Sequence, residues 1–254
     1  HKTPGHEYQE YFHTNINGAK NVCNFARQKN VKTIVFTSSI APYGSWEDEK
    51  VEQSLPIPTG PYGISKLIAE EIHKRWQSEK PLERKLIIIR PGVVFGKNEG
   101  GNFTRLYRAI KSNRFFYPGR KDTRKAAIYV KDLVRIIVEL QENEPVGLHL
   151  FNTVYFPNHT LEDICNTMSS ILDLKNPKFV VPSKLLITIS YILKMIGNFT
   201  GLPLDGIHPD RIKKLMVSTN ISGKKLNDHG YNLKYDLESA IIDWHEDCNR
   251  EGLY

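Results

Sequence analysis

Two patterns of hydrophobic residues alternate along the first 160 positions of the chain. Between residues 7 and 28, apolar side chains recur every three or four positions, which predicts an amphipathic helix. Residues 31–37 and 85–90 are instead continuous apolar runs rich in β-branched residues, typical of strands that are covered on both faces. The same patterns predict strands at 127–130 and 148–152 and helices at 61–78, 103–112 and 132–141.

Strands that alternate with helices in this way indicate right-handed βαβ units, and therefore an α/β fold with a doubly wound parallel sheet. Residues 38–59, polar in their middle, are expected to form a loop. The expected helices after residue 160 are 161–172, 184–196, 209–216 and 237–250. We therefore expect a sheet domain over residues 1–159, with some segments that belong to a second domain, and a smaller, mainly helical domain over residues 160–254.

Composition is that of an ordinary globular protein, with 40% hydrophobic and 25% charged residues among 254, enough to bury a sizeable core. The formal net charge of +7 raises the question of a nucleic-acid partner. The basic residues are spread along the chain, however, apart from one dense cluster at residues 120–125. Such a cluster suits a pyrophosphate at least as well as a polynucleotide, and no nucleic-acid-binding motif accompanies it. We expect no nucleic-acid partner.

Cys23, Cys165 and Cys248 are far apart and form neither a metal-binding spacing nor an even disulfide set, which favours a reducing compartment. The histidines show no metal motif either, so we expect no metal site. The best apolar run, Leu185 to Ile196, is about a dozen residues long and contains Lys194. It predicts a buried or interfacial helix, because a spanning helix needs about 20 residues. We expect a cytoplasmic protein with no membrane partner.

Tyr62 and Lys66 are the residues that first indicate chemistry. They are four positions apart on a predicted helix, so their side chains share one face. A tyrosine has an ordinary pKa of ~10, and a lysine ammonium beside it lowers that pKa by stabilising the phenolate. Such a pair can remove a proton from a substrate hydroxyl while hydride leaves the carbon. Ser39 ends its strand where open α/β sheets bind ligands, and its hydroxyl can hold the reacting oxygen.

The Tyr-x-x-x-Lys pair alone is weak evidence, because it often arises by chance. Its context is more specific: a strand ends in Thr37-Ser38-Ser39, a polar loop carries Tyr43-Gly44, and the helix opens with the residues of 61–66. The next strand ends in Arg90-Pro91. A hydrolase is poorly supported, because no Gly-x-Ser-x-Gly elbow occurs in the sequence.

This arrangement resembles the extended short-chain dehydrogenase/reductase family, and within it the NAD-dependent nucleotide-sugar epimerases and dehydratases related to UDP-glucose 4-epimerase. The resemblance covers most of the chain. Its segments are residues 15–22, 35–39, 43–44, 61–66, 90–96, 124–132 and 228–231. It implies a Rossmann-like doubly wound parallel sheet with a smaller, mainly helical carboxyl-terminal substrate domain.

The resemblance also implies roles for individual residues. Three residues would be catalytic. Ser39 would orient the substrate hydroxyl or ketone, and Tyr62 would be the acid/base. Lys66 would lower the pKa of the tyrosine and hold the nicotinamide ribose. The implied cofactor is NAD, with NADP left open, and its contacts are Asn15, Thr37, Ser38, Tyr62, Lys66, Pro91, Gly92 and Val93. The implied substrate is a nucleotide sugar, contacted by Ser39, Tyr43, Val93, Arg124 and Lys125.

The sequence departs from this family in two respects. Galactose-type epimerases commonly carry an Asn where Val93 stands, which weakens an assignment to the interconversion of UDP-glucose and UDP-galactose. The glycine-rich turn that binds pyrophosphate in the family does not precede the catalytic segments. We therefore expect this chain to be part of a longer protein that supplies the turn and the residue selecting NAD or NADP.

The predicted reaction is epimerisation at the sugar C4 through a 4-keto intermediate, with NAD regenerated in each cycle. Two alternatives stay open: an NAD(P)H-dependent ketone reductase or hydroxyl dehydrogenase acting on a 4-keto-sugar or steroid-type substrate, and an inactive or truncated binding module. A dehydratase is disfavoured, because that branch usually has acidic residues where Ile40-Ala41-Pro42 stand. The helices at 7–28 and 61–78 resemble the family's four-helix-bundle interface, so we expect a homodimer.

Overall fold

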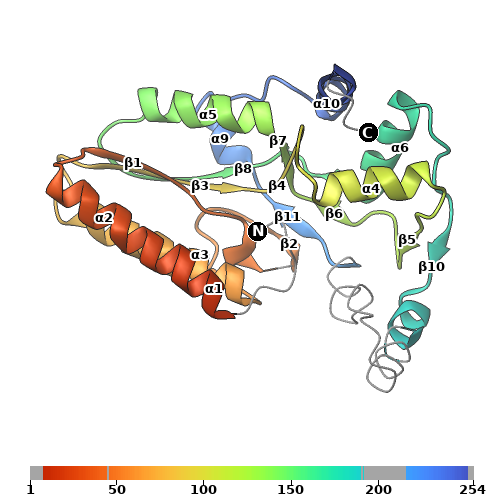
Figure 1. Cartoon of the computed structure of the whole chain (residues 1–254), viewed down its shortest axis with the longest axis horizontal. Coiled ribbons are helices and arrows are strands. Elements are labelled where there is room, and N and C mark those ends of the chain that lie inside the picture. Colours follow the sequence, from red (N-terminus) through yellow and green to blue (C-terminus); the bar gives the residue numbers. More distant parts are fainter. Residues whose placement is uncertain (1–7, 45, 190, 192–215, 251–254) are drawn as a thin grey trace.

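A three-stranded parallel sheet lies at the centre of the protein (Figure 1). The computed structural model describes residues 8–44, 46–189, 191 and 216–250. The strands, in their order across the sheet, are β1 (Thr33–Thr37), β3 (Lys85–Pro91) and β8 (Gly147–Thr153). Because the strands are parallel, their carboxyl ends meet at one edge, where open α/β sheets bind ligands. The predicted parallel α/β fold is confirmed.

Helices cover both faces of this sheet (Figure 1). The helices on one face are α2 (Gly18–Gln28) and α3 (Pro61–Ser78), and those on the other are α5 (Val130–Asn143) and α9 (Lys224–Asp228). Successive side chains of β3 point to opposite faces, so its continuous apolar run meets both layers. The cluster on the side of α2 and α3 consists of Cys23, Ala26, Ile34, Trp76, Leu86 and Ile88. The cluster on the side of α5 includes Ile87, Ile89, Leu133, Ile136, Leu140 and Phe151.

The helix predicted over residues 7–28 is interrupted in the part that the structure describes. It consists of α1 (Tyr8–Phe12), a π-helical turn η1 (His13–Asn17) and α2. A π-helical turn widens the helix and changes the direction of the side chains before it, and such turns are common at functional sites. Hydrophobic spacing alone did not reveal this turn, because α1 and α2 both pack against α3 on either side of it.

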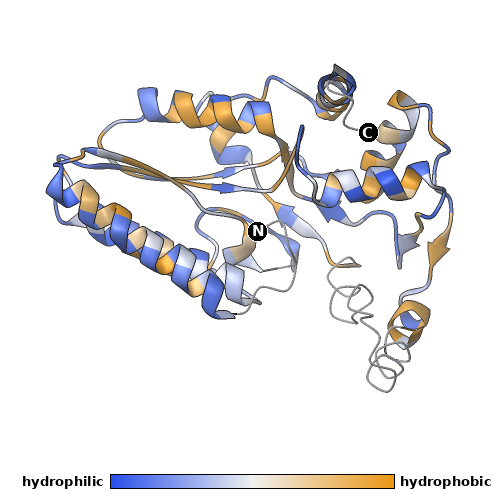
Figure 2. Cartoon of the chain, viewed as in Figure 1, coloured by the Kyte–Doolittle hydropathy of each residue, from blue (hydrophilic) through white to orange (hydrophobic). Residues whose placement is uncertain are grey.

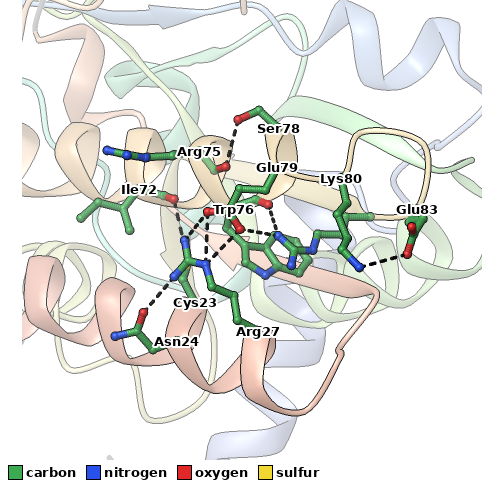
Figure 3. A network of polar contacts seen from close by, with 11 residues as sticks. Cys23, Asn24, Arg27, Ile72, Arg75, Trp76, Ser78, Glu79, Lys80 and Glu83 are labelled. Carbon is green, nitrogen blue, oxygen red and sulfur yellow. Dashed lines mark hydrogen bonds and ion pairs between the residues drawn. The ribbon is translucent and has the colours of Figure 1, made fainter.

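Polar contacts join the ends of α2 and α3 (Figure 3). Arg27 contacts Glu79 with two nitrogens, with Nη2 2.7 Å from Oε1 and Nε 3.0 Å from Oε2. Glu79 also accepts a hydrogen bond from Nη1 of Arg84 at 2.8 Å. The two arginines lower the pKa of Glu79 to about 2. Because Glu79 is partly exposed, solvent screens these pairs and they add little to stability.

A second hydrophobic core lies beyond the central sheet and draws on residues before and after position 160. Its elements are β4 (Val93–Phe95), α4 (Asn102–Lys111), β7 (Ala127–Tyr129), α6 (Leu161–Ile171) and α10 (Leu237–Arg250). Phe95 is central to it, stacked on Phe103 at 4.2 Å between ring centroids and lying edge-on to Trp244 at 6.2 Å. This core attaches the helices after residue 160 to β4 and β7, and β4 directly follows the carboxyl end of β3.

Several short strands were missed by the sequence analysis. They are β2 (Trp46–Lys50), β5 (Tyr117–Pro118), β6 (Arg124–Lys125), β9 (His159–Thr160), β10 (Val180–Val181) and β11 (Thr219–Ile221). Four of them form a sheet in the order β2-β11-β6-β9. Most of β2 is charged and exposed, so the expected loop at 38–59 contains a strand that no apolar pattern signals. Pairing between distant segments creates these strands, and local sequence does not report it.

Two of the four helices predicted after residue 160 are confirmed, and the other two lie partly or almost wholly outside the described residues. The predictions at 161–172 and 237–250 are confirmed by α6 and α10. Thr160 begins α6 with a capping box, in which its hydroxyl accepts from the Asp163 backbone at 3.0 Å and Asp163 accepts from the Thr160 backbone at 2.9 Å. Of the helix predicted at 184–196, the structure describes a helical segment at 183–189. The helix predicted at 209–216 lies almost wholly outside the described residues.

No helix among the described residues is both long and apolar enough to cross a membrane.

Candidate active site

The three residues predicted to be catalytic come from two elements that meet at the carboxyl end of β1. Ser39 follows this strand directly, whereas Tyr62 and Lys66 lie in the first turns of α3. The backbone N–H of Ser38 donates to the carbonyl oxygen of Ile89 at 2.7 Å, so the β1–β3 ladder continues to the edge of the site. Ser39 is therefore held by the sheet itself.

The start of α3 packs closely on the turn that follows Ser39. Pro61 opens the helix at a position where its missing N–H is not needed. Gly63 then faces the 3-10 turn η2 (Ala41–Tyr43), and a Cβ on this glycine would lie 2.6 Å from the carbonyl oxygen of Ala41. Only a residue without a side chain allows this approach, which brings the first turn of α3 next to Ser39.

Tyr62 forms a side-chain hydrogen bond with Ser39. Burial raises the pKa of Tyr62 above its ordinary value, and the hydrogen bond from Ser39 opposes that rise. The ring of Tyr11 lies edge-on to Tyr62, with 5.8 Å between ring centroids. The hydroxyl groups of Ser39 and Tyr62 thus lie together, as the sequence predicted.

Lys66 shares the helix face of Tyr62 but contacts the end of β1. Its Nζ donates to the carbonyl oxygen of Thr37 at 3.0 Å and lies 5.0 Å from the ring centroid of Phe36. Burial lowers the pKa of Lys66, while the charge of Glu70 opposes this change. We expected Lys66 to lower the pKa of Tyr62; in this structure that pKa is raised, and Lys66 is not among the groups that shift it.

A pocket of about 650 Å³ opens over Tyr62 and Lys66. Its other lining residues belong to α1 and η1 and are Gln9, Glu10, Tyr11, His13, Thr14 and Asn15. The π-helical turn brings Asn15 against α3, where its Nδ2 donates to Oγ of Ser65 at 2.8 Å. Ser65 in turn donates to the carbonyl oxygen of Tyr62 at 2.9 Å. Asn15, predicted as a cofactor contact, therefore lines the same pocket as Tyr62 and Lys66.

One turn after Lys66, α3 carries Glu70, which forms a buried ion pair with Arg90 near the end of β3. Nε of Arg90 donates to Oε1 at 2.9 Å and Nη2 donates to Oε2 at 2.5 Å. Burial disfavours the charge on Arg90, but Glu70 outweighs it and holds the pKa of Arg90 above its ordinary value. Ser38 donates to Oε1 of the same carboxylate at 2.5 Å. The side chain of Ser38, predicted to contact the cofactor, is therefore buried against Glu70.

Tyr43 completes the surroundings of Arg90. Its ring centroid lies 4.5 Å from the guanidinium carbon, and its hydroxyl donates to Oδ1 of Asn152 at 2.9 Å. Asn152 is itself held, because its N–H donates to Oε1 of Glu52 at 2.8 Å and its Nδ2 to the carbonyl oxygen of Ser222 at 3.1 Å. We expected Tyr43 to line a sugar pocket. The structure places it fully in the core, where it supports Arg90.

Pro91, Gly92 and Val93, predicted near the nicotinamide, follow Arg90 at the carboxyl end of β3 and lead into β4. The backbone N–H of Val93 donates to the carbonyl oxygen of Ala126 at 2.9 Å. A Cβ on Gly92 would lie 2.7 Å from the same oxygen, so the crossing of these two backbones requires a glycine. The three residues lie at the same edge of the sheet as Ser39.

Arg124 and Lys125, predicted to meet a substrate phosphate, form β6 in the four-stranded sheet. Nη1 of Arg124 donates to the carbonyl oxygen of Asn158 at 2.9 Å, and Nζ of Lys125 donates to that of Val217 at 3.0 Å. Burial lowers the pKa of Lys125 to about 8, although the carboxylate of Glu47 opposes the change. Both cations therefore project from β6, and each is held in place by a backbone carbonyl oxygen from another segment.

Sequence reasoning assigned no role to Glu70, Asn152 or Ser65. A signal for Glu70 existed, because Arg90 ends a continuous apolar strand, and a buried arginine needs a carboxylate partner. Which carboxylate it would be depends on how α3 crosses β3, and the sequence does not show this. The described residues also hold no group of three or more side chains suited to bind a metal ion.

The chain is similar in sequence and in fold to known proteins. A family model described as the NAD dependent epimerase/dehydratase family matches residues 4–152. The chain is 29% identical over 231 residues to the N-acetyl-alpha-D-glucosaminyl-diphospho-ditrans,octacis-undecaprenol 4-epimerase of Escherichia coli O157:H7, covering 91% of this chain and 70% of that relative. It is 38% identical over 109 residues to the UDP-glucose 4-epimerase of Bacillus subtilis, covering 42% of this chain and 32% of that one.

Among solved structures, the UDP-glucuronic acid 4-epimerase from Bacillus cereus in complex with NAD superposes with a TM-score of 0.72 at 17% identity. The superposition covers 99% of this chain and 72% of that chain. At this level of identity the likeness concerns the fold, and it confirms the Rossmann-like architecture that the sequence predicted.

The buried ion pair generates a prediction about stability. Glu70→Gln leaves the charge of Arg90 without a partner in the core, so we expect the free energy of unfolding to fall by ~3–5 kcal/mol. Glu79→Gln is the matched control, because it removes an exposed carboxylate that also contacts arginine, and we expect a loss of at most ~1 kcal/mol. Chemical denaturation followed by circular dichroism measures both, and equal losses would contradict the assignment.

Proposed function

Because the chain belongs to the NAD-dependent epimerase/dehydratase family, we propose that this enzyme inverts C4 of a sugar carried on a diphosphate, with NAD as its cofactor. The relatives named above support this reaction, since each is a 4-epimerase by name. The observation that carries the proposal is the hydrogen-bonded pair of Ser39 and Tyr62 beside a pocket that Tyr62 and Lys66 line.

The pocket suits the nicotinamide end of a dinucleotide. An ammonium and an amide face it from Lys66 and Asn15, and both groups can hydrogen-bond the hydroxyls of a ribose. Its volume of about 650 Å³ lies in the range of small-molecule sites. Lys66 and Asn15 hold the ribose in this proposal, and Gly92 and Val93 border the ring. When bound, NAD supplies a reversible hydride acceptor next to the sugar C4.

Tyr62 moves the proton in the proposed mechanism. As the phenolate, Tyr62 would take the proton of the C4 hydroxyl when the C4–H bond breaks, and as the phenol it would return that proton to the oxygen at C4 when the inverted configuration forms. Ser39 donates a hydrogen bond to the sugar oxygen throughout, which stabilises the charge that develops there. The hydrogen bond from Ser39 opposes the effect of burial on the pKa of Tyr62 and so favours the phenolate. Proton and hydride both return to the sugar, and only the configuration of C4 changes.

Arg124 and Lys125 are the proposed contacts of the diphosphate, since both present cations from a fixed strand. Two kinds of carrier share this chemistry. The Bacillus subtilis relative is named for a nucleotide sugar, and the Escherichia coli relative for a sugar on a polyprenyl diphosphate. Both present a diphosphate on the anomeric carbon, so the same two cations serve either carrier.

We also propose a homodimer formed through the outer faces of α2 and α3. Phe25 is 56% exposed on α2, and Val22 is exposed one turn before it. Ile64 and Ile68 are exposed one turn apart on α3. Neighbouring apolar side chains of this kind on an open helix surface favour a protein contact, and they support the four-helix bundle expected from the sequence.

Tyr62→Phe tests the acid/base assignment. The variant cannot exchange a proton, so we expect turnover to fall by at least ~100-fold. Proton NMR of UDP-N-acetylglucosamine or its polyprenyl counterpart measures the rate of C4 inversion. Tyr107→Phe removes a hydroxyl from the second core and serves as the matched control, with turnover expected near that of the parent protein. Turnover of Tyr62→Phe at the parent rate would show that another group moves the proton.

Lys125 generates a prediction about pH. Its pKa is lowered to about 8, so it is charged below that pH and neutral above it. We expect kcat/KM to fall as pH rises through about 8, because the free enzyme then loses a cation that binds the diphosphate. Lys125→Met should abolish this step. Lys121→Met is the control, since Lys121 pairs with Glu162 at 2.9 Å, and should keep it. A step that persists in Lys125→Met would exclude Lys125 from diphosphate binding.

The proposed interface predicts a change of oligomeric state. Phe25→Glu places a charge in the centre of the apolar face of α2, so we expect the dimer to dissociate in sedimentation velocity experiments. Val138→Glu introduces the same charge at an exposed apolar position of α5 and should leave the dimer intact. A parent protein that sediments as a monomer at every concentration would contradict the interface.

A further inference from the structure

An exposed apolar surface lies at the far end of the second core from the central sheet. We call it the apolar shelf, and its residues are Phe116, Phe179, Val180, Leu185 and Ile189. Phe179 is 80% exposed and Leu185 is 51% exposed, values at which large apolar side chains face solvent. Figure 2 shows β10 and the helical segment that follows it largely in the hydrophobic colour. Phe116 and Phe179 directly precede the paired residues Tyr117 and Val180, and Leu185 and Ile189 lie one helical turn apart, so the exposed residues form two neighbouring groups.

The shelf is held by regular structure. Strands β5 and β10 pair in parallel, with the Tyr117 N–H donating to the carbonyl oxygen of Phe179 at 2.8 Å. In the helical segment 183–189, Leu186 is buried, whereas Leu185 and Ile189 lie four positions apart on an exposed face. The protein therefore presents these side chains to solvent from a fixed backbone.

Charge around the shelf indicates what covers it. Lys175, Lys178 and Lys184 are all exposed, and the only acidic residue between positions 173 and 189 is Asp173. Lysine is depleted in the cores of protein–protein interfaces. Apolar side chains flanked by lysines are instead the pattern of surfaces that lie in the headgroup region of an anionic membrane.

The shelf is also connected to the proposed diphosphate site. Strand β5 pairs with β10 at the shelf, and the chain then runs from Pro118 to Arg124 in β6. Six residues of extended chain span at most ~20 Å. A sugar on a polyprenyl diphosphate has its lipid in the bilayer and its diphosphate at headgroup level. A protein seated on its apolar shelf would hold Arg124 within ~20 Å of that level.

We propose that the apolar shelf docks on the anionic surface of a membrane, and that the sugar diphosphate used by this enzyme is carried on a polyprenyl lipid. The choice of carrier rests on the proposed function, whereas the docking surface stands without it. The sequence led us to expect no membrane partner, and the proposal departs from that expectation, because peripheral contact needs no spanning helix.

Binding to vesicles tests the docking surface without any assay of activity. The full-length protein is sedimented with vesicles of phosphatidylcholine, or of phosphatidylethanolamine mixed with phosphatidylglycerol, and we expect binding to the anionic vesicles. The double variant Phe179→Ser/Leu185→Ser should lower that affinity at least ~10-fold. Lys175→Gln and Lys178→Gln should each lower it about fivefold.

Matched controls come from the opposite end of the molecule, where loops join α2 to β1 and α3 to β3 (Figure 1). Leu82→Ser removes a leucine that is 92% exposed, and Lys29→Gln removes an exposed lysine. Both should bind vesicles as the parent protein does. Equal binding to neutral and anionic vesicles, or no loss in the shelf variants, would overturn the docking surface. Dissociation of a dimer by Phe179→Ser/Leu185→Ser, with vesicle binding unchanged, would assign the shelf to a second copy instead.

Turnover tests the carrier. We expect the protein to invert N-acetylglucosamine on a polyprenyl diphosphate in vesicles, and the shelf variant to lose this activity at least ~10-fold. Efficient turnover of UDP-N-acetylglucosamine that the shelf variant retains, with no turnover of the lipid-linked sugar, would overturn the lipid carrier but leave the epimerase intact. Turnover of neither substrate would overturn the proposed function and the carrier, and the vesicle result would still decide the docking surface.

Discussion

The buried pair of Glu70 and Arg90 is the contact on which the candidate active site depends. It joins α3, which carries Tyr62 and Lys66, to the end of β3, and both side chains are almost completely buried. Two charges removed from water are stable only when they satisfy each other, because each alone carries a desolvation cost of several kcal/mol. The helix can therefore neither slide nor rotate on the sheet without separating them. Ser38 donates to the same carboxylate, so the residue next to Ser39 is fastened to the same point.

Two close approaches between backbone segments complete this arrangement. Gly63 lets the start of α3 pack on the turn after Ser39. Gly92 lets the chain after β3 cross the backbone at Ala126, between β6 and β7. Tyr43 and Asn152 then connect Arg90 to β8 and to the segment around Ser222, far along the chain. The proposed catalytic groups, the proposed nicotinamide side of the pocket and the strand proposed to hold the diphosphate are thus all connected to the same buried ion pair. This suits the proposed reaction, in which a sugar must present both faces of C4 to the same groups.

Much of this fold could be predicted from local pattern. Amphipathic periodicity placed α3 and α10 at the residues where the structure has them, and the apolar run of β3 indicated its burial on both faces. Ser39, Tyr62 and Lys66 could be predicted as a catalytic group because short motifs mark them, one at the end of a strand and one at the start of a helix, and the structure brings Ser39 and Tyr62 together. The short polar strands β2, β6 and β9 could not be found, because partners distant in sequence create them. The sequence does not distinguish an aromatic residue in the core from one that lines a pocket. Nothing near Tyr43 in the sequence could therefore show that its side chain is buried in the core.

The most direct test of this account follows one hydrogen atom. A sugar diphosphate deuterated at C4 is incubated with the protein and NAD in ordinary water, and the product is examined by NMR and mass spectrometry. We expect the inverted sugar to keep its deuterium at C4 and no reduced cofactor to accumulate, because in the proposed reaction the hydride returns to the carbon it left. Exchange of the deuterium with solvent, or reduced cofactor formed in proportion to a ketone product, would contradict it; the second result would identify a net dehydrogenase.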